Sequence, residues 1–345
     1  MTYLALIVAF VASILLTPFV KKLAYRIGAV DKPNHRKVHS SVMPRLGGLA
    51  IFIAFLIGIA VAHPMDKSMV AILIGGFVIV ITGALDDMLE ITPKAKLLGQ
   101  LAAALIVIFF GGVQIDFINL PFDGKLTFGY FSIPLTILWI LAITNAINLI
   151  DGLDGLAAGV STIALVTLAG MAFIMSNGFV LVIALILAAS TCGFLFYNFH
   201  PAKIFMGDTG ALFLGFMIAV LSLLGFKNVT FISLVIPIVM LGVPISDTFF
   251  AIVRRLLNKQ PPFSPDKSHL HHRLMSIGFT HRQTVLLIYG IAAMFGVAAV
   301  TFSMATVWGA ILLITVILIA IELFVEAIGL AGQNYRPLLN LVRRK

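Results

Sequence analysis

Amides, carboxylates and glycines gather in the segment from Asn145 to Gly155, directly after an apolar stretch that begins near residue 131. Asn145, Asn148, Asp151 and Asp154 recur every three residues, so a helix that continued through Asp154 would place them roughly along one face. Polar groups at the end of a membrane helix are costly, which makes packing alone a weak explanation for them. The pattern predicts a face that binds a metal ion, a sugar nucleotide or both.

Two further segments offer carboxylates. Asp86 and Asp87 end an apolar run, and Asp208 lies in the segment Phe205-Met-Gly-Asp-Thr-Gly210. Carboxylate oxygens suit Mg²⁺, which proteins usually bind through one or two carboxylates together with substrate phosphates. The alternatives are an exposed acidic helix end for the pair and an N-cap for Asp208, since Asp is a preferred capping residue.

Two basic segments could bind phosphate. The first holds four Lys and Arg residues between positions 32 and 45, ending in Arg45, with two histidines among them. The second holds His269, His271, His272 and Arg273. Contact with anionic lipid headgroups is the alternative for the first segment. A zinc site is disfavoured for the second, because no cysteine accompanies the histidines and no fourth ligand is evident nearby.

The elements that must position these residues are membrane helices. Of 345 residues, 61% are hydrophobic and 11% are charged, and the mean hydropathy is +1.11. A soluble domain could not bury such a composition. The sequence therefore predicts an all-α polytopic integral membrane protein. Eleven apolar runs have helix-spanning length, at about residues 3–20, 46–62, 69–85, 95–112, 131–150, 156–175, 179–199, 209–226, 231–253, 283–303 and 306–324.

Lysine and arginine set the orientation of these runs. With the first loop in the cytoplasm, the inner segments hold 20 Lys and Arg and the outer loops hold 3. This bias predicts an outer N-terminus and a cytoplasmic C-terminus, with a small outer hairpin near residues 114–127. The basic balance follows from topology, so no nucleic-acid partner is expected. The chemistry-bearing residues then lie in five cytoplasmic segments, at 21–45, 86–96, 145–155, 200–210 and 254–282.

These motifs, in this order and on one side of the membrane, resemble the polyprenyl-phosphate N-acetylhexosamine-1-phosphate transferase superfamily over almost the whole chain. Within it, the chain looks most like bacterial undecaprenyl-phosphate GlcNAc-1-phosphate transferases that begin teichoic acid or enterobacterial common antigen synthesis. Two segments favour that branch, namely Asp31-Lys-Pro-Asn-His-Arg-Lys and His269-Leu-His-His-Arg. Glu90, at the last position of the acidic motif, departs from the family's aspartate-rich form.

The resemblance implies one membrane-embedded transferase domain over residues 1–345 in the bacterial cytoplasmic membrane. Its implied substrates are UDP-GlcNAc and undecaprenyl phosphate, with Mg²⁺ as cofactor and Mn²⁺ as a substitute. Asp208 would hold the metal with Asp151 or Asp154, and Asp86 or Asp87 would act as a base, with Asp151 and Asp154 also in catalytic positions. Phe205 would stack on uracil, and the remaining substrate contacts would come from Arg45, Asn145, Asn148, His269, His271, His272 and Arg273.

Other functions remain open at this point. The same chemistry could use another UDP-N-acetylhexosamine or UDP-MurNAc-pentapeptide as donor. An ion-coupled transporter is disfavoured, since the acids within the apolar runs, Asp247 and Glu322, lie near inner ends and no internal repeat is evident. A CDP-alcohol phosphatidyltransferase is disfavoured because its acidic motif is missing. The sequence leaves a homodimer possible.

Overall fold

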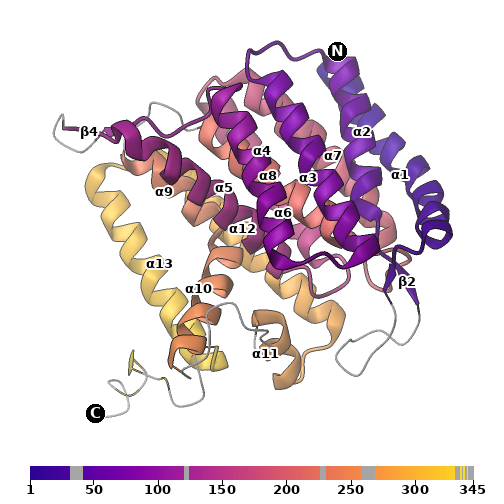
Figure 1. The fold of residues 1–345 in the computed structure, drawn as a ribbon. Coiled ribbons are helices and arrows are strands. Elements are labelled where there is room, and N and C mark those ends of the chain that lie inside the picture. Colours follow the sequence, from indigo (N-terminus) through magenta and orange to yellow (C-terminus); the bar gives the residue numbers. More distant parts are fainter. Residues whose placement is uncertain are drawn as a thin grey trace. The chain divides into compact units, whose positions relative to one another are not determined.

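The computed structural model describes residues 1–31, 42–119, 124–225, 231–257 and 269–330, together with a few positions between 335 and 340. The chain forms two compact units, Met1–Phe231 and Ile232–Lys345. Both are built almost entirely from helices (Figure 1). The single transferase domain over residues 1–345 was predicted from a function that both units would share, and it stays a prediction.

The described residues of the first unit form eight α-helices, which follow the first eight predicted apolar runs. Lipid offers no partner to backbone N–H and C=O groups, so a chain of this composition satisfies them within helices. The bounds are α1 Thr2–Ile27, α2 Gly47–Ala62, α3 Met69–Leu89, α4 Pro93–Phe109, α5 Ser132–Leu149, α6 Leu156–Ile174, α7 Gly178–Asn198 and α8 Gly207–Gly225, with a 3-10 turn at Gly129–Phe131.

Two short antiparallel hairpins accompany these helices. Strand β3 (Phe117–Asn119) pairs with β4 (Lys125–Thr127), which confirms a hairpin within residues 114–127. Strand β1 (Val30–Asp31) pairs with β2 (Met43–Pro44). The chain that follows β2 forms a parallel bridge to the segment before α8 through Arg45 and Phe205. This bridge joins two of the segments that carry predicted site residues.

Helix α8 lies in the centre of the first unit and packs against α2, α3, α5 and α6 (Figure 1). Every residue from Thr209 to Leu223 is buried. Glycines let the neighbouring helices approach the start of α8 closely. A Cβ atom at Gly48 would lie 2.1 Å from Cα of Gly210, and one at Gly83 would lie 2.5 Å from Cα of Thr209. The beginning of α8 is therefore held between α2 and α3.

The second unit contains α9 (Phe231–Met240), α10 (Gly242–Leu257), α11 (Leu270–Ile277), α12 (His281–Met304) and α13 (Val307–Ile328). The ninth predicted run, 231–253, was expected to be one helix and is instead divided between α9 and α10. Pro237 lacks an N–H group and weakens helical continuity, and Gly242 follows at the start of α10. The short helix α11 carries three of the predicted site residues and begins after His269.

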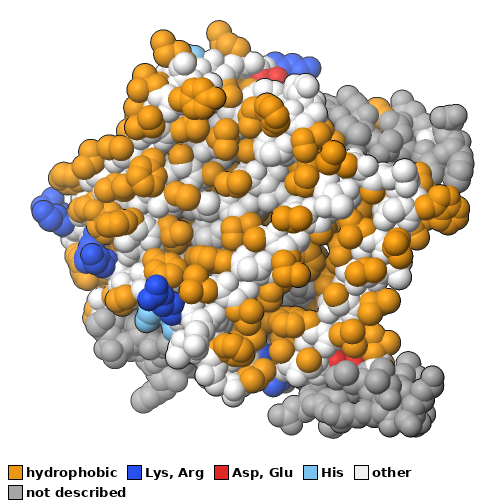
Figure 2. Space-filling model, turned by 180° about the vertical axis from the view of Figure 1, so that it is seen from behind, with side chains coloured by type: hydrophobic (Ala, Val, Ile, Leu, Met, Phe, Trp, Pro, Cys, Tyr) orange, Lys and Arg blue, Asp and Glu red, His pale blue; other side chains and the backbone are white. Residues whose placement is uncertain are grey.

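The helices suit a membrane in length and in surface. Eight of those described are long and apolar enough to span one, and α2 is a shorter apolar helix of 16 residues. The face in Figure 2 carries mostly hydrophobic side chains, with a few Lys and Arg. Large hydrophobic residues such as Phe19 and Phe173 are exposed on the surface of the protein. The chain is an all-α polytopic membrane protein. The count of eleven spans and the orientation stay predictions.

Candidate active site

The segment Asn145–Gly155 does not form one continuous helix, so the condition for placing its four polar residues along one helix face is not met. Helix α5 ends at Leu149 and α6 begins at Leu156, after Gly155 with φ 77°. Gly152 and Gly155 favour a turn, and a positive φ at Gly155 costs little because it has no Cβ atom. Asn145 and Asn148 consequently lie in the last turns of α5, whereas the two aspartates that follow belong to the turn.

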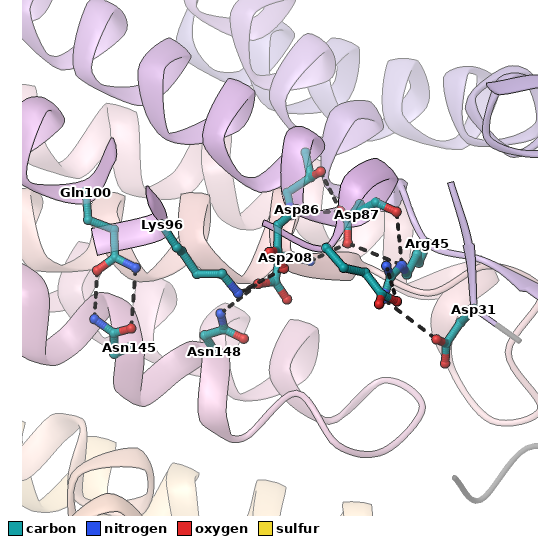
Figure 3. A network of polar contacts seen from close by, with 11 residues as sticks. Asp31, Arg45, Asp86, Asp87, Lys96, Gln100, Asn145, Asn148 and Asp208 are labelled. Atoms are coloured by element: carbon teal, nitrogen blue, oxygen red, sulfur yellow. Dashed lines mark hydrogen bonds and ion pairs between the residues drawn. The ribbon is translucent and has the colours of Figure 1, made fainter. Parts of the chain in front are cut away.

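Asn145 pairs with Gln100 of α4. Its Nδ2 donates to Oε1 of Gln100 at 2.7 Å, and Nε2 of Gln100 donates back to Oδ1 of Asn145 at 3.3 Å. Nδ2 also donates to the Leu141 carbonyl at 2.8 Å. Gln100 is buried. The contacts of Asn145 therefore join α4 to α5, one turn away from Lys96 and Asn148 on the same two helices (Figure 3).

Lys96, Asn148 and Asp86 meet at Asp208 (Figure 3). The Lys96 ammonium contacts Oδ2 of Asp208 and lies 2.9 Å from Oδ2 of Asp86. Nδ2 of Asn148 donates to the same Asp208 oxygen at 3.3 Å. Four elements, α3, α4, α5 and α8, therefore bring two carboxylates, a cation and an amide to one point. All these side chains except that of Lys96 were predicted site residues.

Asp87 caps α8 from a different helix. Its carboxylate accepts hydrogen bonds from the backbone N–H of Asp208 at 3.0 Å, and from both N–H and Oγ1 of Thr209, at 3.0 and 2.6 Å. Only 2% of the residue is exposed. The first N–H groups of a helix lack partners within it, so a buried start needs such an acceptor. The alternative role of Asp208 as N-cap is not observed, because Asp208 lies inside the first turn.

Arg45 joins the first basic segment to the acidic helix. Nε donates to the Asp87 carbonyl oxygen at 3.1 Å, Nη2 lies 3.3 Å from Oε1 of Glu90, and Nη1 lies 3.7 Å from Oδ1 of Asp31. Glu90 is thereby given a contact that its sequence position left undefined. Phe205 is tied to the same strand, since its N–H donates to the Pro44 carbonyl at 2.8 Å. Parts of the predicted cytoplasmic segments 21–45 and 254–282, at residues 32–41 and 258–268, lie outside the described residues.

The two aspartates of the turn differ in their surroundings. Oδ2 of Asp154 lies 2.8 Å from Nδ1 of His200 and accepts from the Ala202 N–H at 3.1 Å, so it organises the loop before α8. No described residue donates a hydrogen bond to the Asp151 carboxyl group. Burial, followed by repulsion from Asp208, Asp87 and Asp154, raises the pKa of Asp151 to about 8. Four carboxyl groups therefore lie near one another in this part of the site.

The histidine segment lies in the second unit. Nδ1 of His269 lies 2.9 Å from Oδ2 of Asp247, and the Leu270 N–H donates to Oδ1 of Asp247 at 2.8 Å. The His269 and His271 rings are stacked, with centroids 6.1 Å apart and an interplanar angle of 3°. Burial, with like charge from the neighbouring histidine as a smaller cause, lowers the pKa of His271 to about 3. His272 contacts the His271 ring, and Arg273 follows in α11.

Comparison with known proteins follows the same motifs. The family described as Glycosyl transferase family 4 matches residues 69–226, which include α3 to α8. A probable undecaprenyl-phosphate N-acetylglucosaminyl 1-phosphate transferase of Bacillus subtilis (strain 168) is 49% identical over 98% of this chain and 96% of its own length. The chain belongs to glycosyl transferase family 4. This glycosyl transferase is also similar to less identical proteins whose names describe polyprenyl-phosphate N-acetylglucosamine phosphate transfer.

Two of these relatives come from other bacterial groups. A decaprenyl-phosphate N-acetylglucosaminephosphotransferase of Mycolicibacterium smegmatis is 36% identical, over 89% of this chain and 85% of its own. An undecaprenyl-phosphate alpha-N-acetylglucosaminyl 1-phosphate transferase of Escherichia coli (strain K12) is 30% identical, over 84% and 80%. The superfamily predicted from the motifs is therefore confirmed.

The site of this family 4 transferase also contains residues that the sequence analysis missed. Lys96 and Gln100 lie four residues apart on α4, hence on one face of that helix. Polar side chains within an apolar run were the available signal, and in a membrane helix such residues point to function. His200 was missed as well, because nothing in the sequence indicated that Asp154 would contact it. The result is a cluster that can bind a divalent cation and phosphate oxygens with fixed carboxylate, ammonium and amide groups.

Proposed function

We propose that this protein transfers GlcNAc-1-phosphate from UDP-GlcNAc to undecaprenyl phosphate, giving undecaprenyl-pyrophosphoryl-GlcNAc and UMP. A phosphate oxygen of the lipid forms a bond to the β-phosphorus of the nucleotide sugar, and the bond from that phosphorus to the bridging oxygen breaks, so UMP leaves. The observation that carries the proposal is the point where Lys96 joins Asp86 to Asp208, in a chain related over its length to a transferase of that name.

The donor set fits Mg²⁺. Asp208, Asp86 and Asp151 offer hard carboxylate oxygens, and the Lys96 ammonium, which contacts Asp86 and Asp208, balances only one of these negative charges. Asp208 and Asp151 are the residues proposed to hold the ion; the contacts of Asp154 with His200 and Ala202 support a positioning role for it instead. Mg²⁺ supplies positive charge that neutralises pyrophosphate oxygens, and Mn²⁺ shares its preference for oxygen ligands.

The chain's own side chains have distinct proposed roles. Asp86 is the candidate that orients or deprotonates the lipid phosphate, because its carboxylate is partly exposed and, within the part of the chain that the structure describes, forms an ion pair with Lys96 alone. A phosphate monoester has a second pKa near about 6, so positioning matters more than proton removal. Asp87 holds the start of α8 and thereby Asp208, while Asn148 orients the Asp208 carboxylate.

The substrates also favour one side of the membrane. A polyprenyl phosphate requires a groove open to lipid, whereas a nucleotide sugar is a cytosolic molecule, so both meet at the cytoplasmic edge. The Lys and Arg bias supports that side for the acidic cluster. Donor contacts of Phe205, Arg45 and the histidine segment remain proposals from the family resemblance, and the Gln100 pair supports a positioning role for Asn145.

UMP release tests this proposal. Purified protein with undecaprenyl phosphate and Mg²⁺ is given UDP-GlcNAc, UDP-GalNAc or UDP-MurNAc-pentapeptide. We expect lipid-dependent UMP release with UDP-GlcNAc, loss of release on chelation with EDTA, and recovery with Mg²⁺ or Mn²⁺. Asp208→Ala should abolish turnover at saturating Mg²⁺. Preference for the pentapeptide donor would move the protein to peptidoglycan synthesis, and no release with any donor, together with ion flux into vesicles, would favour transport.

A further inference from the structure

Asp247 is a buried acid whose contacts serve one short segment of the second unit. It lies on α10 with 2% of its surface exposed, and both of its carboxylate oxygens are used. Oδ1 accepts from the Leu270 N–H, the first helical N–H of α11, and Oδ2 contacts Nδ1 of His269. One side chain therefore caps α11 and fixes the imidazole ring that precedes it.

The contact decides where the proton of His269 lies. An ionised carboxylate only accepts hydrogen bonds, so the nitrogen 2.9 Å from Oδ2 carries the proton. In the neutral ring, the other nitrogen, Nε2, then has a lone pair and no hydrogen. Among the described residues, none contacts Nε2 by a hydrogen bond. His269 is thus prepared to accept a hydrogen bond from a ligand at that atom.

We propose that Asp247 is a positioning residue that holds His269 as the Nδ1–H tautomer, so that Nε2 accepts a hydrogen bond from an O–H or N–H group of the donor substrate. This inference rests on the proposed function, in which the histidine segment binds the nucleotide sugar. It changes the chemistry expected of His269. A nitrogen without a hydrogen cannot donate to a phosphate oxygen, so the partner is a sugar hydroxyl, the acetamido N–H or the uracil N–H.

The neighbouring His271 ring also argues against a phosphate-binding role for this segment. His271 is parallel to His269 and buried, in surroundings that disfavour a charged imidazole. A phosphate-binding cluster would gain from cationic rings, whereas recognition of neutral polar groups requires a fixed tautomer. The helix cap adds a second constraint on position, because the His269 backbone leads directly into α11.

Three substitutions separate positioning from folding. Asp247→Asn keeps an oxygen for the Leu270 N–H and brings an N–H donor to Nδ1, which forces the proton onto Nε2. His269→Asn retains an N–H group where Nδ1 lies but has nothing in place of Nε2, whereas His269→Gln retains a polar group near the Nε2 position. Ser246→Ala is the matched control, since it removes only a local bond from Ser246 Oγ to the Val243 carbonyl on the same helix.

The first measurement is ¹⁵N NMR of histidine-labelled protein in micelles without substrate, with the His269 signal assigned by its loss in His269→Asn. We expect an unprotonated Nε2 in the wild type and a protonated Nε2 in Asp247→Asn. The second is steady-state kinetics. Asp247→Asn and His269→Asn should raise KM for UDP-GlcNAc by about 10–100-fold, leave KM for the lipid nearly unchanged, and show no further loss when combined.

Each outcome supports or overturns the proposal. His269→Gln should recover part of the donor affinity, and Ser246→Ala should match the wild type. A wild-type Nε2–H tautomer, or a His269→Asn protein with wild-type KM for the donor, would overturn it. If Asp247→Asn does not fold, the comparison of His269→Asn with His269→Gln still decides. Failure of the proposed function is distinguishable, because the tautomer is measured without substrate and independently of UMP release.

Discussion

Replacement of Asp87 by asparagine should destabilise the protein, whereas the same change at the adjacent Asp86 should mainly reduce activity. The Asp87 carboxylate accepts three hydrogen bonds at the buried start of α8, from Asp208 N–H, Thr209 N–H and Thr209 Oγ1. An asparagine offers one acceptor oxygen and points an NH₂ group at a remaining donor. At least one buried N–H is then unsatisfied, which costs about 1–3 kcal/mol, with a further loss from charge-assisted bonds.

We therefore expect Asp87→Asn to lower the free energy of unfolding by about 2–4 kcal/mol. Asp86 is more exposed, with 15% of its side chain accessible, and its ion pair with Lys96 is partly exposed too. Asp86→Asn leaves Lys96 in contact with Asp208 and keeps a side-chain oxygen, so it should cost only about 1 kcal/mol. Thr209→Val removes only the bond from Oγ1 in a buried position and should cost about 1–2 kcal/mol.

Unfolding is measured by SDS titration in mixed micelles, with circular dichroism as the signal. UMP release is measured on the same preparations. The single and double variants of Asp87 and Thr209 form a double-mutant cycle. The double variant should lose less stability than the sum of the two single variants, because both single changes remove the same hydrogen bond. An Asp87→Asn protein that unfolds like the wild type but has lost all turnover would refute the reasoning, since Asp87 would then act on the substrate and not through α8.

Three further predictions concern packing and ionisation. Gln100→Leu and Asn145→Leu should each reduce turnover by displacing Lys96 and Asn148, and the double variant should be little worse than either; additive losses in UMP release would argue against a shared role. Gly83→Ala should destabilise the protein, because its Cβ would lie 2.5 Å from Cα of Thr209. The control, Gly170→Ala, adds a Cβ that meets no atom within 4 Å and should be neutral or slightly stabilising in the same SDS titration. Equal unfolding midpoints for the two variants would contradict the close contact. Burial lowers the pKa of His271 from an ordinary value of 6.5 to about 3 in the folded protein. The neutral imidazole therefore contributes stability that is complete above pH 6.5 and decreases as the pH falls towards 3, by about 2 kcal/mol at pH 5. Hydrogen exchange of α11 at pH 7 and 5 should show this loss in the wild type and less of it in His271→Gln.

The sequence predicted the membrane helices well because composition alone determines them. An apolar run of about 20 residues has no stable conformation in lipid other than a helix, so ranges such as 156–175 and 179–199 match α6 and α7 closely. The prediction failed where glycine and proline compete with helical periodicity. Asn145 to Asp154 kept a three-residue spacing, yet Gly152 and Gly155 ended the helix between the amides and the acids.

The members of the acidic cluster were predictable as residue types, but their partners were not. A carboxylate at a membrane edge is unusual enough to mark Asp86, Asp87 and Asp208 without a structure. Which of them faces Lys96 and which faces a helix end depends on how α3 and α8 pack, and that depends on contacts more than 100 residues apart in the chain. Adjacent aspartates gave no sign that one would be exposed to a cation and the other enclosed by backbone N–H groups.

Two aspartates, one in each unit, cap the start of a helix from a neighbouring helix. Helices α8 and α11 both begin next to predicted site residues, and their first turns contain buried residues, Thr209 and Leu270, whose N–H groups have no partner within the helix. Asp87 and Asp247 supply the missing acceptors from other helices, and each does so beside a group with a proposed chemical role, Asp208 in one unit and His269 in the other. A cap within the same helix would fix only the local backbone. A cap from a neighbouring helix also fixes the distance between the two helices, so the position of the functional side chain becomes part of the packing of the fold. For this reason, the substitution of either aspartate should be felt both in the stability of the unit and in the precision of its site, in proportions that the asparagine variants can measure.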